Sequence, residues 1–299
     1  MRLIELKFFS LLLSAYIAMD INRHIDIMGI VNINDDSFFG GSRCPDVTSA
    51  MKRVETMVAE GATIIDFGAC STRPGSESIG ADEEWRRLEP VLKEMKRQFP
   101  EVRLSVDTYW AAVVQKVYQS FGDFMVNDIS AGEDDPEMLP LVGRLGLTYV
   151  AMHKKGNPSD MQSHAVYENV TEDVVRYFMD FSLKASGFGI DDWILDPGFG
   201  FAKTIGQNYQ LLRELEMLKS VSRGDGSQPR ILVGVSRKSM VYRFLDITPE
   251  DSLAATQVVH LSALENGADI LRVHDVAEAV RTVSLYRMLT SDSSLHFFY

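Results

Sequence analysis

A short pattern that recurs along the 299-residue chain constrains its fold more than any other feature of the sequence. A helical stretch ends near a glycine, four or five mostly apolar residues follow, and the run ends on a polar or charged residue. The clearest copies are Glu60–Asp66 and Asn266–Asp275, and looser copies are Phe121–Asp128 and Leu145–His153. Glycine readily adopts the left-handed conformation that caps a helix, and a short apolar strand is typical of a buried parallel sheet.

Eight strands of this kind are predicted, with helical patterns between them. The predicted strands lie around Ile27–Asn32, Ile64–Phe67, Leu104–Val106, Phe124–Val126, Tyr149–Met152, Trp193–Leu195, Ile231–Val233 and Ile270–Val273. The helical patterns include Thr48–Glu60, Ala81–Gln98, Thr171–Ser186, Gln207–Lys219, Ser252–Asn266 and Val276–Leu289. Strands that alternate with helices form right-handed βαβ units, and eight such units indicate a closed (β/α)8 TIM barrel. An open, doubly wound sheet is the alternative.

The length of the chain fits one such domain, because a single barrel takes roughly 250 residues. We predict a poorly ordered N-terminal arm at residues 1–26, the barrel at residues 27–290 and a C-terminal tail at residues 291–299. The apolar run around Phe8–Leu13 is too short for a membrane span, which needs about 20 residues. No clean signal-peptide cleavage site follows it, so we do not expect export.

The net charge and the cysteine content argue against several kinds of partner and site. The formal net charge of −12 argues against nucleic acid or an anionic membrane as the main partner, although a local basic cluster can still bind a small anion. The two cysteines, Cys44 and Cys70, form neither a disulfide framework nor a zinc-binding spacing. We therefore expect reduced thiols and a cytoplasmic enzyme.

Polar side chains follow every predicted strand. The carboxyl ends of the strands form the active site in such a barrel, so these residues should gather at one mouth. They are Asn32, Asp35, Asp36, Asp66, Thr72, Arg73, Asp107, Asn127, Asp128, His153, Asp196, Ser236, Arg237, Lys238, Arg272, His274 and Asp275. A single aspartate at such a place more often caps the next helix, but polar groups at all eight ends indicate a site.

The last two predicted strands indicate an anion-binding site. TIM barrels commonly bind phosphate at the loops after strands seven and eight, which here carry Ser236–Ser239 and Arg272–His274. Arginine offers a planar fork for phosphate oxygens and lysine a point charge. The alternative is a set of salt bridges to neighbouring carboxylates.

Two carboxylates and an amide, Asp107, Asp196 and Asn127, end otherwise apolar strands. They could form in-plane hydrogen bonds with a nitrogen-rich heterocycle, or they could bind a hard metal ion, and the residues alone do not decide between these. Two loops rich in glycine or proline, Phe38–Ser42 and Thr72–Ser76, could close over a substrate or be ordinary turns.

Taken in order, these segments resemble the dihydropteroate synthases, which join a pterin to p-aminobenzoate. The matching motifs are Met28–Phe38, Asp66–Gly75, Ser105–Thr108, Asn127–Ile129, Met152–His153, Asp196–Phe201, Gly234–Ser239 and Arg272–Asp275. The resemblance covers about residues 27–290. The chain departs from the usual family pattern at Asp35, at Phe39–Ser42, at Cys70 and at Ala202, where a glycine is usual.

The resemblance implies a role for each matching residue. Asn32 would hold Mg²⁺, which bridges to the diphosphate of the pterin substrate, and Arg272 and His274 would bind that diphosphate. The pterin ring would be held by Asp107, Asn127, Met152, Asp196 and Lys238. The p-aminobenzoate site would be lined by Thr72, Pro74, Phe201 and Ser239. Catalysis would use Asp36, Phe38, Arg73 and Lys238.

The predicted reaction condenses 6-hydroxymethyl-7,8-dihydropterin diphosphate with p-aminobenzoate to give 7,8-dihydropteroate and diphosphate. The resemblance further implies a homodimer, and sulfonamides should compete with p-aminobenzoate because they mimic its ring and amine. One alternative is a pterin-dependent methyltransferase that acts with a corrinoid protein. Another is a non-catalytic barrel that only binds a pterin or a partner protein.

Overall fold

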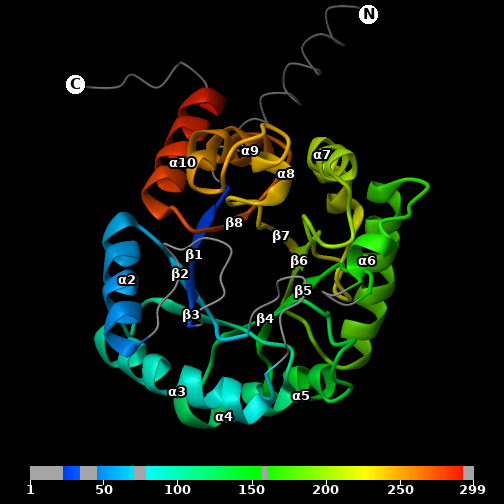
Figure 1. Ribbon diagram of the computed structural model, residues 1–299. Helices are drawn as coiled ribbons and strands as arrows, with labels where there is room; N and C mark the ends of the chain where they lie inside the picture. The colour runs from blue at the N-terminus through cyan, green and yellow to red at the C-terminus, as the bar shows by residue number, and fades with distance from the viewer. Residues whose placement is uncertain (1–22, 34–45, 71–78, 157–159, 292–299) are drawn as a thin grey trace, which may run out of the picture.

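Eight parallel strands close into a barrel in the predicted order (Figure 1). The computed structural model describes residues 23–33, 46–70, 79–156 and 160–291. The strands are β1 (Asp26–Asn32), β2 (Ile64–Gly68), β3 (Arg103–Asp107), β4 (Met125–Asp128), β5 (Thr148–Met152), β6 (Trp193–Asp196), β7 (Arg230–Val233) and β8 (Ile270–Val273). β1 pairs with both β2 and β8, so the sheet has no open edge and the doubly wound alternative is wrong.

Helices surround the barrel and cover its outer face (Figure 1). They are α2 (Val47–Glu60), α3 (Ala81–Gln98), α4 (Ala111–Phe121), α5 (Met138–Leu145), α6 (Val170–Gly187), α7 (Ile205–Arg213), α8 (Ser239–Tyr242), α9 (Leu253–Glu265) and α10 (Val276–Thr290), with 3₁₀ turns η2 (Met161–His164), η3 (Leu215–Ser220) and η4 (Glu250–Ser252). The helix predicted at Gln207–Lys219 is divided into α7 and η3. Over six residues, an apolar pattern hardly distinguishes an α-helix from a 3₁₀ helix.

Helix ends follow the glycine pattern of the sequence. Gly61 and Gly267, in the two clearest copies, have φ of 105° and 102°, which is the conformation expected of a residue that ends a helix. Gly61 donates its N–H back to the last turn of α2. At the other end of α2, Asp46 and Ser49 form a reciprocal capping box. Among the described residues, no helix is both long and apolar enough to cross a membrane.

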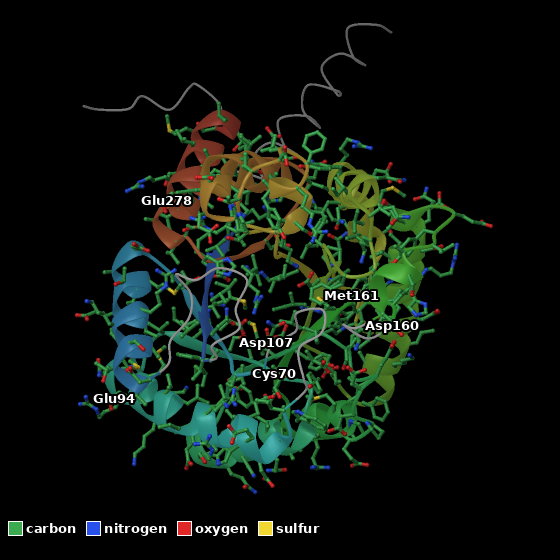
Figure 2. The ribbon with its side chains drawn as sticks, in the orientation of Figure 1. Cys70, Glu94, Asp107, Asp160, Met161 and Glu278 are labelled. Atoms are coloured by element: carbon green, nitrogen blue, oxygen red, sulfur yellow. The ribbon has the colours of Figure 1, made fainter. Side chains whose placement is uncertain are left out.

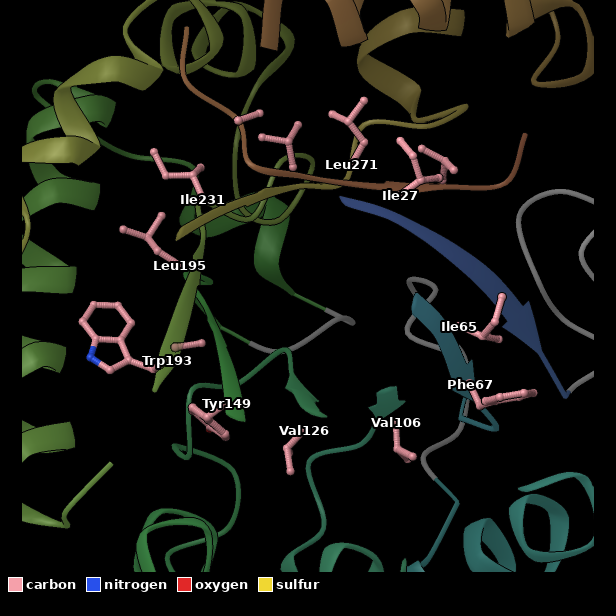
Figure 3. Packing of buried hydrophobic residues seen from close by; sticks show 14 of the residues in the cluster. Ile27, Ile65, Phe67, Val106, Val126, Tyr149, Trp193, Leu195, Ile231 and Leu271 are labelled. Carbon is pink, nitrogen blue, oxygen red and sulfur yellow. The ribbon is translucent and has the colours of Figure 1, made fainter. Parts of the chain in front are cut away.

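Alternation along the strands divides the apolar side chains into two clusters. One lies between the sheet and the helices, and Figure 3 shows part of it, including Phe67, Tyr149 and Trp193. The other fills the inside of the barrel and consists of Met28, Ile64, Met125, Val150, Ile194, Leu232 and Ile270. The barrel is therefore a packed core at mid-height and not a channel.

Ionic contacts close the amino-terminal end of the barrel, below the inner apolar cluster. The Asp26 side chain is fully buried there. It accepts a hydrogen bond from Thr63 Oγ1 at 2.8 Å and pairs with Arg230 at 2.7 Å and with Arg103. His24 lies 3.1 Å away. We call Asp26, Thr63, Arg103 and Arg230 the basal cluster. It joins β1, β3, β7 and the residue before β2, at the end of the barrel where stability and not catalysis is expected.

Candidate active site

The polar side chains predicted for the site lie one layer above the inner apolar cluster. Because side chains of a strand alternate, a residue two positions after an inner apolar residue also points inward. Asp66, Asn127, Met152, Asp196 and Arg272 each follow such a residue by two positions. Asp107 lies inside the ring of strands at the same mouth (Figure 2). The predicted gathering of polar strand-end residues is therefore confirmed for Asp66, Asp107, Asn127, Asp196 and Arg272.

Some predicted residues cannot be placed. Asp36 and Phe38 on the first loop, and Thr72, Arg73 and Pro74 on the second, lie outside the described residues. Their assigned roles stay predictions.

Arg272 is the centre of the polar layer. Its Nε donates to Asp66 at 2.7 Å and its Nη2 donates to Asp107 at 2.7 Å. Asp66 is fully buried and also accepts hydrogen bonds from Ser105 Oγ at 2.6 Å and Asn127 Nδ2 at 3.0 Å. These contacts fix the side chains of β2, β3, β4 and β8 relative to one another. Asp66 was predicted at the mouth without a role, and the structure makes it the common acceptor.

Burial and the charge of Arg272 act in opposite directions on the ionisation of Asp107. Burial raises its pKa, to about 7, although the charge of Arg272 opposes this rise. Burial alone would lower the pKa of Arg272, but the charges of Asp66 and Asp107 raise it overall. Burial therefore favours the protonated form of the Asp107 carboxyl, which can donate a hydrogen bond, and Arg272 favours the ionised form, which can only accept one. Such a group suits a ring that presents both N–H groups and bare nitrogens.

Lys238 connects the other half of the mouth to the β6–α7 loop. Its Nζ donates to the Phe199 carbonyl at 2.5 Å and lies 4.8 Å from the centre of the Phe201 ring. Burial lowers the pKa of Lys238, to about 8, and the charge of Asp196 opposes that shift. Burial likewise raises the pKa of Asp196, opposed by Lys238. The structure thus brings together the predicted pterin residues Asp196 and Lys238 and the predicted p-aminobenzoate residue Phe201.

Lys203, which is buried at the end of the β6–α7 loop, was missed by the sequence-based prediction. Its Nζ lies 3.0 Å from His153 Nδ1 and donates to the carbonyls of Gly198 and Phe201, at 3.0 and 3.1 Å. Burial lowers the pKa of Lys203, to about 7. Lys203 follows the loop and not a strand, so the strand-end rule did not reveal it. Ala202, where the family usually has glycine, is buried and has φ of 49°.

The predicted positive cluster is smaller than expected. Arg237 points away from the mouth, because its guanidinium pairs with both oxygens of Asp275, at 2.8 and 3.0 Å, and donates to the carbonyls of Pro249 and Glu250. The salt-bridge alternative is therefore correct for Arg237. Asp128 is also structural, since it accepts from Tyr149 Oη at 2.6 Å and from Ser130 Oγ at 2.7 Å.

His274 lies beside Arg272 at the end of β8. Ser236 Oγ accepts the His274 backbone N–H at 3.1 Å and lies 3.2 Å from His274 Nδ1. Arg53 on α2 donates to the His274 carbonyl. Burial lowers the pKa of His274, to about 3, and the charge of Arg272 adds to this effect. The imidazole is therefore neutral at physiological pH.

Asn32 ends β1 directly opposite Gly68 of β2. A methyl group placed on Gly68 would lie 3.6 Å from Asn32 Oδ1 and 3.7 Å from Asp107 Oδ2. Glycine at this position therefore leaves a small space onto which two side-chain oxygens converge. Ser239, the remaining predicted residue, begins α8 directly after Lys238 and is half-buried.

Comparison with known proteins identifies the family. The model of the pterin binding enzyme family matches residues 28–274. The dihydropteroate synthase of Escherichia coli strain K12 is 36% identical over 262 residues, which cover 87% of this chain and 90% of that protein. The synthase of Synechocystis is 36% identical over 86% of this chain and 87% of its own length.

Solved structures agree in fold and sequence. A complex of the Yersinia pestis dihydropteroate synthase with a sulfonamide drug superposes with a TM-score of 0.82 at 34% identity, covering 89% of this chain and 94% of that chain. The Burkholderia cenocepacia synthase, complexed with 7,8-dihydropteroate, gives 0.80 at 33% identity, with coverages of 90% and 92%. Since family model, sequence relatives and structures agree over most of its length, the chain belongs to the dihydropteroate synthase family of pterin-binding enzymes.

Proposed function

We propose that the barrel mouth condenses 6-hydroxymethyl-7,8-dihydropterin diphosphate with p-aminobenzoate. In this reaction, a bond forms between the amine nitrogen of p-aminobenzoate and the methylene carbon of the pterin substrate. The bond from that carbon to the diphosphate oxygen breaks, and diphosphate leaves with the electron pair. The amine loses one proton, and 7,8-dihydropteroate results.

One observation carries the proposal: the polar layer joins Asp66, Asp107, Asn127 and Arg272 in one hydrogen-bonded set above an apolar floor. A flat heterocycle with both donors and acceptors can bind to such a set without leaving a buried polar group unpaired, which would cost about 1–3 kcal/mol. Asp196 and Lys238 supply an acceptor and a donor on the opposite side of the mouth. Relatives of this chain bind the expected product, 7,8-dihydropteroate, or the second substrate, 4-aminobenzoic acid.

At the leaving group, Arg272 of β8 and His274, the residue directly after β8, would stabilise the charge that develops on diphosphate. In the structure, Arg272 is ion-paired with two carboxylates. Binding of diphosphate would therefore exchange or share these partners, and the pairs keep the guanidinium oriented until then. On the other side, the Phe201 ring and Lys238 would hold the aromatic amine beside the pterin.

Magnesium fits the residues at this mouth. Mg²⁺ prefers oxygen ligands and is commonly held by one or two protein groups together with substrate phosphates. The Asn32 carboxamide oxygen, which faces the space above Gly68, would supply such a ligand. When bound, Mg²⁺ would neutralise negative charge on the leaving diphosphate. Among the described residues, no group of three or more histidine, cysteine or acidic side chains forms a metal cage.

The test is diphosphate release by the purified protein with each substrate alone and with both together. Fast release that needs both substrates and Mg²⁺, with 7,8-dihydropteroate formed in equal amount, supports the synthase. Methyl transfer to a corrinoid protein without diphosphate chemistry would support the methyltransferase instead. Pterin binding without any turnover would support the non-catalytic barrel.

We also propose a homodimer formed through the outer faces of α9 and α10, which pack against each other. Val258 on α9 and Leu285, Met288 and Leu289 on α10 leave at least half of their surfaces exposed. The three α10 residues have the spacing that places them on one face of a helix. Sedimentation should show a dimer, and Leu285→Glu should give a monomer.

The proposed location is the cytoplasm, supported by the acidic composition and the paucity of cysteine. Sulfonamides are the proposed inhibitors, supported by the complex of the Yersinia pestis relative with such a drug.

A further inference from the structure

We propose that Ser236 is a positioning residue that keeps the proton of the neutral His274 imidazole on Nε2, so that His274 acts as a fixed hydrogen-bond donor toward the leaving diphosphate. The inference deepens the proposed function and rests on it. Ser236 belongs to the turn after β7 and His274 to the end of β8, so the contact joins the two loops at which TIM barrels commonly bind phosphate.

The hydrogen bonds of one oxygen carry the argument. Ser236 Oγ accepts the backbone N–H of His274 at 3.1 Å, and this N–H can only donate. The same oxygen lies 3.2 Å from His274 Nδ1. Ser236 is 4% exposed, so its own hydroxyl proton needs an acceptor inside the protein.

Within the described part of the chain, His274 Nδ1 is the one acceptor that the Ser236 hydroxyl proton meets. If Nδ1 carried the proton, two N–H donors would face one oxygen and the buried hydroxyl proton would have no partner. If Nδ1 is bare, Ser236 accepts from the backbone and donates to the ring, and every group is satisfied. The second arrangement is favoured because a buried donor without a partner costs about 1–3 kcal/mol.

A bare Nδ1 places the single proton of a neutral imidazole on Nε2. The low pKa of His274, caused by burial and the charge of Arg272, supports the neutral form. Arg53 fixes the backbone of the same residue from the other side, by donating to its carbonyl. His274 is thus held at its N–H, its carbonyl and its ring, as a preorganised donor must be.

This arrangement defines what His274 contributes. A neutral imidazole with its proton on Nε2 donates one hydrogen bond to a phosphate oxygen and remains neutral. Arg272 then supplies positive charge to the diphosphate, and His274 supplies a hydrogen bond of fixed direction. With the other tautomer, a lone pair would face the anionic oxygen and repel it.

The direct test is nitrogen-15 NMR of the histidine rings in the intact protein at pH 7. The chain contains six histidines, and loss of signals in His274→Gln identifies those of His274. We expect Nε2 protonated and Nδ1 bare. A protonated Nδ1, or a charged ring, in the wild-type protein would overturn the inference whatever the variants do.

Variants connect the tautomer to function. In Ser236→Ala the His274 ring should lose its single tautomer, and KM for the pterin diphosphate should rise about 2- to 12-fold, the range expected for one net hydrogen bond. Ser236→Thr, which keeps a hydroxyl, should restore the single His274 tautomer and the wild-type KM. The matched control is Ser182→Ala on α6, which removes one buried hydroxyl bond, to the Ser222 carbonyl at 2.6 Å, far from the mouth. Ser182→Ala should change neither the His274 tautomer nor the KM for the pterin diphosphate.

The outcomes separate the inference from the proposed function. If the wild-type protein releases no diphosphate with both substrates present, the proposed function fails, and the NMR result still decides the tautomer. If it does turn over, and Ser236→Ala keeps both the Nε2 tautomer and the wild-type KM, the inference fails and the synthase assignment stands.

Discussion

Replacing Asp26 by asparagine should destabilise the barrel without altering its chemistry. The substitution keeps the volume of the side chain and removes its charge, which leaves Arg103 and Arg230 facing each other across the basal cluster. Breaking a buried ion pair by removing one partner costs about 3–5 kcal/mol. Arg103 and Arg230 remain 45% and 31% exposed and can be solvated, so we expect a loss of about 2–3 kcal/mol, below that range.

The stability lost in Asp26→Asn should be larger at neutral pH than at acidic pH. Burial alone would raise the pKa of Asp26, but Thr63, Arg230 and Arg103 lower it below its usual value of 3.8. A carboxyl whose pKa is lower in the folded protein stabilises the fold above its unfolded pKa, and this contribution disappears as the pH falls through the folded pKa. The difference between the wild-type protein and Asp26→Asn should therefore be full at pH 7 and should shrink as the pH falls below 3.8 and through the folded pKa.

Thermal and urea unfolding at pH 7 and at a series of pH values below 3.8 measure the effect. A loss of 2–3 kcal/mol corresponds to a fall in Tm of about 4–12 °C for a chain of this size. Asp82→Asn is the control, because Asp82 also lies close to a cation, Lys116 at 2.7 Å, but is 97% exposed; water screens this pair, so its removal should leave the Tm almost unchanged. Equal Tm values for Asp26→Asn and wild type at pH 7, or a difference that does not shrink as the pH falls below 3.8, would refute the reasoning.

Three further predictions concern the mouth. Asp107→Asn and Asp196→Asn should each abolish measurable pterin binding while leaving the fold intact, and unchanged affinity in calorimetry would place the pterin elsewhere. Lys203→Met should raise KM for p-aminobenzoate more than KM for the pterin diphosphate, because Lys203 holds the Phe201 carbonyl at 3.1 Å; equal increases would contradict this role. Sulfonamides should inhibit competitively against p-aminobenzoate, so a strictly noncompetitive pattern in steady-state kinetics would exclude a shared site.

The fold could be predicted because eight apolar strands alternate with helical stretches, and much of the mouth could be predicted because side chains along a strand alternate with a period of two. Once Ile64, Met125 and Ile270 are assigned to the inside of a parallel barrel, Asp66, Asn127 and Arg272 must point inward one layer higher. Nothing beyond the strand boundaries is needed for this inference.

Positions set by loop geometry could not be predicted in the same way. Arg237 has φ of 53°, a left-handed conformation unusual for arginine, and its side chain is directed to Asp275 and away from the mouth. Lys203 lies seven residues beyond the end of β6, and only the path of the loop brings its ammonium group back to His153. The alternation of side chains along the strands does not determine the direction of either side chain.

The pairing of β1 with β8 has a consequence for the synthesis of the chain. Asp26 of β1 lies opposite Ile270 of β8, 244 residues further along the chain. At about 5–20 residues per second, the ribosome needs roughly 12–50 s to make the intervening segment. During that time β1 has one hydrogen-bonding edge without its final partner, and its apolar sequence is the kind that associates with other chains. The nascent chain is therefore most exposed to aggregation before the last strand emerges, and a truncation that removes β8 would make this temporary state permanent.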